Sequence, residues 1–386
     1  MTEYYLDHAA SAPRRAEVSE AMAPWMQGVV GNPSGSHRAA RMARRAVEDA
    51  RDDVAALTGA KPGNVVFTAG GTESCTLAIA GRVRRHQREH ATSRVLVSAI
   101  EHHAVLDAAD MMARQLSSVS VDHVPVDGDG VVDLEVLGRF LQQPDVAIVS
   151  VMAANNETGV VQPVDAVGSL ARSAGVISHS DMVAAAPWMD LSALGPELDM
   201  LSLCAHKIGG PVNAGALIMR TEQTLDALAP GGGQEKGRRG GTVDVAAAVG
   251  LATALRLVHD ERAHSVAHTT ELRDRLAAHL SGIDGCRVTA MSAQRLPGTV
   301  HVTFDDVASD EVLFLLDQAG IFASAAASCS SGAAVASHVL DAMGIAPTRA
   351  KGSLRLSMGP EFTADDIDAV ATTISAVIAR LRAESH

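Results

Sequence analysis

A lysine and an aspartate follow two apolar segments of this sequence and could act together in chemistry. Lys207 comes soon after apolar residues 198–203 and enters the turn Ile208-Gly209-Gly210-Pro211. Asp181 follows another apolar segment, residues 175–180. A lysine amine can bond covalently to an aldehyde, and a carboxylate can pair with a protonated pyridine nitrogen. Pyridoxal phosphate carries both groups, so this pair of side chains predicts a site for that cofactor.

Two further polar side chains follow strand-like segments in the same way. His102 comes after residues 94–98, and Asn156 comes after residues 146–152. A histidine in this position could stack on an aromatic cofactor and carry protons near neutral pH, or it could simply cap a helix. Because the carboxyl ends of parallel strands meet at one edge of a sheet, we expect both side chains to share a crevice with the lysine and the aspartate.

Two glycine-rich segments could bind the phosphate of such a cofactor. Gly71 and Thr72 lie in a turn between strand-like residues 64–68 and a helical segment. Backbone amides at a helix start, with a hydroxyl beside them, form an anion site, although many such turns are rich in glycine for steric reasons only. The second segment, residues 231–242, is either a mobile linker or an anion-binding loop. The hydroxyl of Thr242, just before a helix, favours the loop.

Cys329 lies among the small residues 324–334, which offer few side chains for packing. Free cysteines are mostly buried and inert. A thiol among serines, alanines and glycine is instead expected to be exposed, and its thiolate is the reactive form. The segment therefore predicts a flexible loop with a reactive thiol. No metal-binding or disulfide spacing links it to the remaining cysteines, which are Cys75, Cys204 and Cys286.

Strand-like and helical segments alternate along the chain and predict the α/β class. The strand-like segments are continuous apolar runs, which is typical of a mainly parallel sheet covered by helices on both faces. A long helical pattern, residues 243–281, leads to strand-like residues 299–304 and 354–357 and to a C-terminal helix, residues 364–383. A chain of 386 residues exceeds what one core supports. We predict a large cofactor-binding domain, residues 15–255, and a smaller α/β domain, residues 1–14 and 256–386.

The composition argues against several kinds of partner. A net charge of −13 leaves no basic face for nucleic acid. The arginine-rich segments 38–51 and 82–88 are expected to form solvated helix faces. No apolar segment is long enough to predict a membrane span, and the first residues do not resemble a signal peptide. We therefore expect a cytoplasmic protein with reduced thiols and no resident metal.

The motifs resemble those of the cysteine desulfurases of the NifS and IscS type, in the long-loop class of fold-type I pyridoxal phosphate enzymes. The resemblance extends over nearly the whole chain and rests on Tyr5-Leu6-Asp7-His8-Ala9-Ala10, Thr72-Glu73-Ser74, Glu101-His102, Asn155-Asn156-Glu157, His206-Lys207, Gly231-Gly232-Gly233 and Gly352-Ser353-Leu354-Arg355-Leu356-Ser357-Met358-Gly359. It implies a large domain with a mainly parallel central sheet flanked by helices. It also implies a smaller α/β domain that carries the cysteine loop, at about residues 322–336.

The resemblance implies roles for the residues around the cofactor. Lys207 would hold the cofactor covalently and move protons at the substrate Cα. Asp181 would pair with the pyridine nitrogen, and His102 would stack on the ring. The phosphate would be bound by residues at four positions of the same chain and by Thr242 of the partner subunit, which implies a homodimer. The four positions are Gly71, Thr72, Cys204 and His206.

The resemblance also implies the substrate and its reaction. Asn156 and Arg355 would hold the carboxylate of L-cysteine, where a guanidinium gives a bidentate pair. The Cys329 thiolate would attack the substrate sulfur, giving L-alanine and a persulfide on Cys329. The sulfur would then pass to an acceptor, such as another protein.

Several positions depart from the family pattern. Ala184 stands where a glutamine would bond the phenolic oxygen of the cofactor. Cys204 replaces a phosphate-binding serine and is a poorer hydrogen-bond donor. Ala326-Ala327-Ser328 replaces Gly-Ser-Ala before the thiol, and Val335-Ala336 replaces a polar residue and a proline. Weaker cofactor binding and altered absorbance are expected.

Three functions therefore remain open from the sequence. The first is a cysteine desulfurase, which retains the thiol, Arg355 and His102. The second is a related C–S lyase or other amino-acid enzyme, which the altered cofactor pocket favours. The third is a cofactor-poor scaffold that binds sulfur-transfer partners, against which Lys207 and Asp181 argue.

Overall fold

A seven-stranded sheet forms the largest layer of the fold. The computed structural model describes residues 2–28, 31–221, 224–325 and 337–384. The strand order is β2-β8-β7-β6-β5-β3-β4. The five strands from β7 to β4 run parallel, whereas β8 runs antiparallel to both β7 and β2. The strands are β2 (Val65–Thr68), β3 (Ser93–Ser98), β4 (Val119–Val124), β5 (Val146–Ser150), β6 (Ile177–Asp181), β7 (Met200–Cys204) and β8 (Gly215–Met219).

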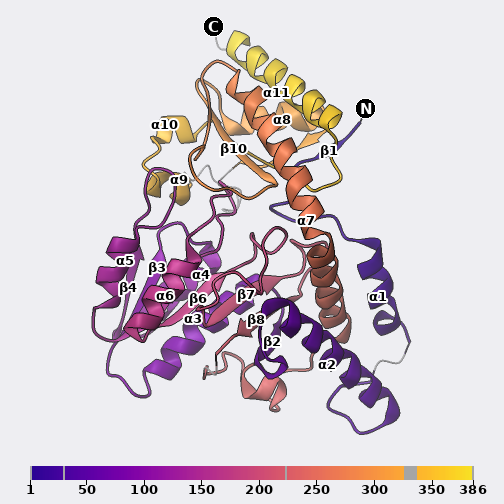
Figure 1. Ribbon diagram of the computed structural model, residues 1–386, viewed down its shortest axis with the longest axis vertical. Helices are drawn as coiled ribbons and strands as arrows, with labels where there is room; N and C mark the ends of the chain where they lie inside the picture. The colour runs from indigo at the N-terminus through magenta and orange to yellow at the C-terminus, as the bar shows by residue number, and fades with distance from the viewer. Residues whose placement is uncertain (1, 29–30, 222–223, 326–336, 385–386) are drawn as a thin grey trace.

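Helices cover both faces of this sheet (Figure 1). Val65 and Phe67 belong to one buried apolar cluster, and Val66 belongs to another. Successive strand residues point to opposite faces, so the strand must be apolar at every position to be covered on both sides. This arrangement confirms the predicted α/β class with a mainly parallel sheet. The helices of this part are α1 (Ala16–Met26), α2 (Arg38–Thr58), α3 (Gly71–His86), α4 (His103–Gln115), α5 (Leu134–Leu141) and α6 (Val164–Ala174).

The 37-residue helix α7 (Val245–Ser281) connects the large sheet to a second group of elements. Asp244 caps its first turn, because the side-chain oxygen accepts a hydrogen bond of 3.0 Å from the backbone N–H of Ala247. In Figure 1 the helix runs from beside α1 and α2 to the layer of β10 and α11. The predicted boundary at residue 255 falls inside this helix, and the two domains stay a prediction. Within the described residues, every helix is too short or too polar to cross a membrane.

The second group is built on a three-stranded antiparallel sheet with the order β12-β10-β9. Its apolar cluster includes Leu6, Phe304 and Leu356 and is covered by α7, α8 and α11. The N-terminus joins this group, because β1 pairs in parallel with β11. Its elements are β1 (Tyr4–Tyr5), β9 (Cys286–Val288), β10 (Thr299–Phe304), α8 (Ser309–Gln318), β11 (Ile321–Phe322), α9 (His338–Ala342), α10 (Pro347–Ala350), β12 (Ser353–Ser357) and α11 (Ala364–Glu384).

One arginine does not follow the expectation of solvated arginine-rich helices. Arg51 on α2 is only 8% exposed, so the prediction for segment 38–51 was wrong at this position. Its guanidinium donates to both carboxylate oxygens of Glu235, at 2.9 and 2.8 Å, and to the carbonyl of Val65 at 2.7 Å. Glu235 lies in the 3-10 helix η2 (Gln234–Gly237), within the glycine-rich segment 231–242. The pair is far apart in sequence, which is why helical spacing alone misplaced the arginine.

Candidate active site

Asp181 and Lys207 meet at the carboxyl edge of the large sheet. Asp181 is the last residue of β6, and Lys207 lies three residues beyond the end of the neighbouring parallel strand β7. Asp181 is 7% exposed, and its Oδ1 accepts a hydrogen bond of 2.8 Å from the backbone N–H of Val183. The Lys207 ammonium donates to the carbonyl of Ala9, near the N-terminus. The strand ends therefore bring the predicted amine and carboxylate to one place.

His102 lies close enough to Asp181 and Lys207 for their charges to shift its pKa. Burial lowers the pKa of His102, Asp181 raises it, and Lys207 lowers it further. Its Nδ1 accepts a hydrogen bond of 3.0 Å from the backbone N–H of Ala104, which caps α4. The proton of the neutral ring is therefore on Nε2. The sequence left open a stacking or a capping role, and the capping contact is present.

The carboxylate of Asp181 fits a cationic partner. Burial raises the pKa of Asp181, while His102, the Val183 amide, Cys75 and Lys207 lower it. A buried carboxylate is costly unless positive charge faces it. A protonated pyridine nitrogen would supply that charge, so the donor set fits pyridoxal phosphate at this end.

The start of α3 could bind the phosphate group of the cofactor. Gly71 is the first residue of the helix, and a Cβ there would lie 2.9 Å from Cγ2 of Val183. The close approach of α3 to the residues after Asp181 therefore requires glycine. Thr72 follows in the first turn, where free amides and the helix dipole attract anions. These features fit a phosphate group.

Cys204 and His206 lie beside this helix start. The Cys204 sulfur is buried and lies 3.8 Å from Nε2 of His206. Burial raises the pKa of the Cys204 thiol to about 12, so it stays protonated at neutral pH. Burial and the charge of Lys207 lower the pKa of His206. A neutral thiol and a neutral imidazole can donate hydrogen bonds to phosphate but add no charge.

Arg355 and Asn156, the predicted carboxylate-binding pair, are in direct contact. Arg355 on β12 is 2% exposed, and its Nη1 donates to the backbone carbonyl of Asn156 at 3.0 Å. Its Nη2 donates to Oδ1 of Asp7 at 2.7 Å. Within the described residues its Nε has no hydrogen-bond partner although it is buried. Sequence reasoning did not name Asp7 as a candidate site residue, and its place two residues after β1, in a motif shared with the family, was the available signal.

Glu101 is a second site residue that sequence reasoning named only as part of a motif. It is fully buried next to His102, and its Oε1 accepts a hydrogen bond of 2.6 Å from the backbone N–H of Met152. Burial, helped by the negative charge of Asp181, raises the pKa of Glu101 to about 8. Glu101 is therefore protonated at neutral pH, and Asp181 is left to face a cofactor cation. A carboxylate directly before a strand-end histidine was the signal in the sequence.

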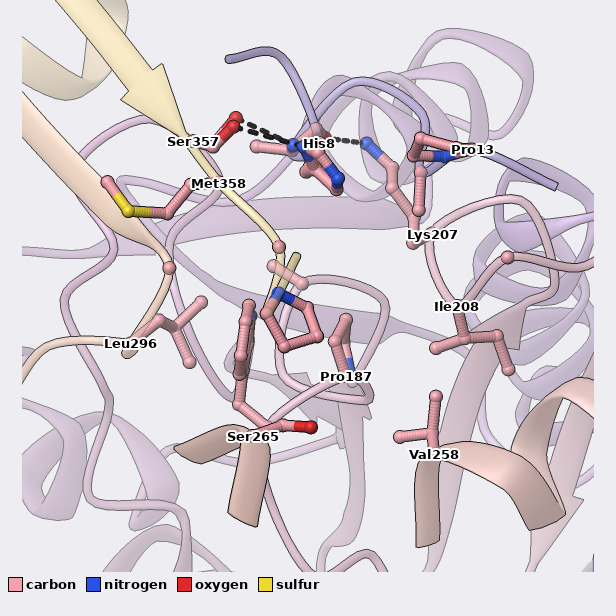
Figure 2. Close-up of a pocket in the computed structure, with 18 of the residues that line it drawn as sticks. His8, Pro13, Pro187, Lys207, Ile208, Val258, Ser265, Leu296, Ser357 and Met358 are labelled. Atoms are coloured by element: carbon pink, nitrogen blue, oxygen red, sulfur yellow. Dashed lines mark hydrogen bonds between the residues drawn. The ribbon is translucent and has the colours of Figure 1, made fainter. Parts of the chain in front are cut away.

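A cavity of about 410 Å³ opens beside Lys207. Asn156 and Val183 also line it, so the cavity connects the lysine with one residue of the pair predicted to bind the substrate carboxylate. Figure 2 shows His8 and Lys207 on one side and Pro187, Leu296 and Val258 on the opposite side. Two close contacts between polar side chains lie in its wall. They are His8–Glu361, with Nε2 and Oε1 2.7 Å apart, and Arg15–Glu261, with Nη2 and Oε1 2.6 Å apart.

Of the predicted site residues that the structure describes, Lys207 and Asn156 line this cavity, and the others, Thr242 among them, do not. Thr242 is exposed and lines a separate cavity of about 210 Å³ beside Thr68, and it is not among the described residues that line the Lys207 cavity. Arg239 of the same glycine-rich segment pairs with Glu73 of α3 at 2.9 Å. Cys329, with the neighbouring replacements at 326–328 and 335–336, lies outside the described residues. In the part of the chain that the structure describes, no three His, Cys, Asp or Glu side chains gather as a metal site would require.

Comparisons with known proteins agree with this arrangement. The family described as Aminotransferase class-V matches residues 4–370. An IscS-like cysteine desulfurase of Mycobacterium tuberculosis is 42% identical over 98% of this chain and 97% of its own length. The cysteine desulfurase NifS of Azotobacter vinelandii is 36% identical over 99% of this chain and 94% of its own length.

Solved structures give the same result for the fold. A NifS-like protein superposes with a TM-score of 0.90 at 30% identity, covering 98% of this chain and 100% of its own. A NifS-like protein of Rickettsia africae gives a TM-score of 0.87 at 28% identity, again covering 98% and 100%. The chain therefore belongs to the aminotransferase class-V family and, within it, to the NifS- and IscS-like group of cysteine desulfurases.

Proposed function

We propose that this protein is a pyridoxal phosphate-dependent cysteine desulfurase, which converts L-cysteine to L-alanine and holds the released sulfur as a persulfide on Cys329. The observation that carries the proposal is the single cavity that holds both Lys207 and Asn156, with Arg355 bonded to Asn156. An amino acid bound there by its carboxylate would present its Cα to the lysine. The sequence similarity to cysteine desulfurases supports the same reaction.

Pyridoxal phosphate, when bound, would withdraw electrons from the substrate carbons next to its amino group. Asp181 would keep the pyridine nitrogen protonated, and the ring of His102 would cover one face. The first turn of α3, with Gly71 and Thr72, would bind the phosphate. His206 and Cys204 would donate further hydrogen bonds to it.

The remaining residues would act on the substrate. Arg355 and Asn156 would orient its carboxylate, and Lys207 would move a proton at Cα. The Cys329 thiolate would bond to the substrate sulfur as the bond between sulfur and Cβ breaks. The electron pair left on Cβ would take up a proton, which gives alanine and leaves a persulfide.

We also propose the molecular setting of this reaction. Thr242 of the partner subunit would complete the phosphate site in a homodimer. A sulfur-acceptor protein would take the persulfide sulfur. The free thiols of Cys75, Cys204 and Cys286 are compatible with the reducing cytoplasm, where we place the protein.

The first test measures sulfide and alanine released from L-cysteine with a reductant, after the visible spectrum has been recorded. Wild type and Cys329→Ala are compared. Equimolar products that disappear in the variant would support the desulfurase. Sulfide that persists in Cys329→Ala, with pyruvate and ammonia in place of alanine, would favour a C–S lyase, because elimination of sulfide does not need the thiol. A colourless protein that cannot be reconstituted with cofactor would favour the scaffold.

A further inference from the structure

A row of polar side chains is buried in the large sheet next to Asp181. Ser150 on β5, His179 on β6 and Ser202 on β7 are all fully buried. The sheet register pairs Ser150 with His179. It also pairs Ser202 with Asp181. Because side chains two residues apart on a strand point to the same face, His179 and Asp181 share one face of β6. The row therefore lies on the face of the carboxylate that would meet the pyridine nitrogen.

Both ring nitrogens of His179 are hydrogen-bonded within this row. Nδ1 lies 2.8 Å from Oγ of Ser150, and Nε2 lies 2.8 Å from Oγ of Ser202. Burial lowers the pKa of His179 to about 3, so at neutral pH the ring is neutral. One nitrogen therefore donates and the other accepts. The adjacent cluster, which includes Cys75 and Met200, is apolar, so these polar groups are stable there only because they are bonded to one another.

Cys75 on α3 connects the row to Asp181. Burial raises the pKa of the Cys75 thiol well above its usual range, whereas a hydrogen bond from Ser202 lowers it. Burial also raises the pKa of Asp181, and a hydrogen bond from Cys75 lowers it. A hydrogen bond lowers the pKa of an acid when it stabilises the anion. Ser202 therefore donates to the sulfur, and the thiol, which keeps its proton, donates to the Asp181 carboxylate.

The donors along the row all point toward Asp181. Because the Ser202 hydroxyl donates to Cys75, its oxygen accepts the proton of His179 Nε2. Nδ1 is then the acceptor of the Ser150 hydroxyl. Each donor is polarised by the donor behind it, which strengthens the last bond to the carboxylate. We call Ser150, His179, Ser202 and Cys75 the donor row.

We propose that His179 is a positioning residue for pyridoxal phosphate, because the donor row that it joins keeps the Asp181 carboxylate charged and oriented toward the ring nitrogen. The inference rests on the proposed function only for the presence and placement of the cofactor. His102 and Lys207 also face Asp181, and they act on it through their charge. The donor row acts through hydrogen bonds, so it can be interrupted while those two residues are unchanged.

The test compares two ligands on the full-length protein. Deazapyridoxal phosphate has a C–H group in place of the ring nitrogen, so only pyridoxal phosphate can bond to Asp181. Dissociation of each ligand from wild type, His179→Phe and Ser202→Ala is followed by fluorescence. We expect both variants to bind pyridoxal phosphate about fivefold more weakly and the deaza compound within about twofold of wild type. Equal losses for the two ligands would overturn the proposal, because a merely structural residue affects both. Unchanged binding of pyridoxal phosphate would overturn it too.

Two substitutions of Cys75 locate the effect at the carboxylate. Cys75→Ala removes the donor next to Asp181 and should weaken binding of pyridoxal phosphate by about tenfold, since hydrogen bonds to charged groups are the stronger ones. Cys75→Ser keeps a donor of similar size and should stay within about twofold of wild type. A Cys75→Ser protein as weak as Cys75→Ala would contradict the donor role. If His179→Phe does not fold, Ser202→Ala and this pair decide, because each alters only one small side chain.

His86→Phe is the matched control for His179→Phe. His86 is also buried, and its Nδ1 lies 2.9 Å from Oγ of Ser93. It is the last residue of α3, whereas the predicted phosphate site is at the first turn of that helix. The variant should leave both ligand affinities as in wild type. A loss in His86→Phe that is equal to the loss in His179→Phe and confined to pyridoxal phosphate would contradict the proposal.

The outcome is separable from that of the proposed function. A protein whose donor-row variants weaken only pyridoxal phosphate, but which releases no alanine from L-cysteine, would retain this inference and lose the desulfurase. A protein that releases alanine and persulfide sulfur, yet whose variants bind the two ligands with equal losses, would retain the desulfurase and lose this inference. A protein that binds neither ligand would lose both.

Discussion

Ala184 removes one hydrogen bond that the family pattern provides to the cofactor. Its methyl group cannot donate the hydrogen bond that a glutamine would give to the phenolic oxygen. We expect Ala184→Gln to bind pyridoxal phosphate about fivefold more tightly, since one such hydrogen bond contributes about 1 kcal/mol. The visible absorbance should also change its dependence on pH. Cofactor dissociation followed by fluorescence checks the first effect, and spectra between pH 6 and 9, a range chosen around neutrality, check the second.

Ala184→Met is the matched control for that prediction. Methionine is close to glutamine in size but cannot donate a hydrogen bond. If Ala184→Met tightens cofactor binding as much as Ala184→Gln does, packing rather than the phenolate contact is responsible, and the prediction fails.

Glu101 makes stability depend on pH through one buried carboxyl group. Its pKa is about 8 in the folded protein against an ordinary value of 4.5, so the folded state keeps a proton that the unfolded state releases. The contribution of Glu101 to the free energy of unfolding is therefore fully present below pH 4.5. It is lost as pH rises from 4.5 to about 8, at up to about 1.4 kcal/mol per pH unit. Glu101→Gln, which stays neutral, should lack this loss.

The measurement is denaturant unfolding of wild type and Glu101→Gln at several pH values across that window. The difference between the two free energies of unfolding isolates the carboxyl group, because the other titrating groups are shared. Glu271→Gln, on the exposed side of α7, controls for the change of residue type. A Glu101→Gln protein with the same pH dependence as wild type would contradict the assigned protonation state.

At the scale of elements, one buried ion pair joins α2, β2 and η2. Arg51 bonds to both oxygens of Glu235, and the same carboxylate accepts a hydrogen bond of 3.0 Å from the backbone of Phe67. We expect Arg51→Met to lower the free energy of unfolding by about 3–5 kcal/mol, because it leaves Glu235 charged and buried. Chemical denaturation measures the loss.

A second variant and a surface pair test the physical reason. Glu235→Gln, added to Arg51→Met, should recover part of the loss, since the amide still accepts from Phe67 and carries no charge. Arg88→Met breaks an ion pair with Asp226 whose arginine side chain is 63% exposed, and it should cost less than about 1 kcal/mol. Equal losses at Arg51 and Arg88 would contradict the role of burial.

Local patterns predicted most of these elements, because helical and strand periodicities extend over neighbouring residues. The strand 299–304 was predicted with the bounds of β10, and the helix 364–383 ends one residue before α11 does. The antiparallel strand β8 was missed, since a short apolar segment after a Gly-Pro turn does not reveal its pairing. The contact of Arg355 with Asp7 joins residues 348 positions apart, which no local spacing encodes.

In the site, too, features set by local sequence could be predicted, and features set by residues distant in sequence could not. Residues at the carboxyl ends of parallel strands, such as Asp181 and Lys207, could be predicted because the topology gathers them at one edge. The protonated state of Glu101 could not, because it depends on burial by elements distant in sequence. The cavity beside Lys207 also could not, since Trp188, Leu296 and Met358 come from three separate segments.

At the scale of the whole molecule, the position of Thr242 bears on assembly. Thr242 is exposed, and among the described residues it lies outside the cavity of its own Lys207. Its segment is fixed to the same chain by the Arg51–Glu235 and Arg239–Glu73 pairs. We expect the Thr242 hydroxyl to serve the phosphate site of a second copy, as the resemblance implies, and a two-fold dimer would make this exchange reciprocal.

Mixing two inactive variants tests this arrangement. Lys207→Ala removes the amine, and Thr242→Asp places a negative charge where the phosphate would bind, so each homodimer should be nearly inactive. In a mixed dimer, the site with Lys207 receives the wild-type Thr242 of the partner subunit and is intact, while the other site carries both changes.

Random assortment makes half of the dimers mixed, each with one intact site of two, so alanine release should recover to about a quarter of wild type. Differently tagged subunits are co-expressed and purified through both tags, which selects mixed dimers and should raise recovery to about half. If the mixed dimers are no more active than the two variants alone, Thr242 acts within its own chain or not at all, because only sharing between subunits can rebuild a site from two defective ones.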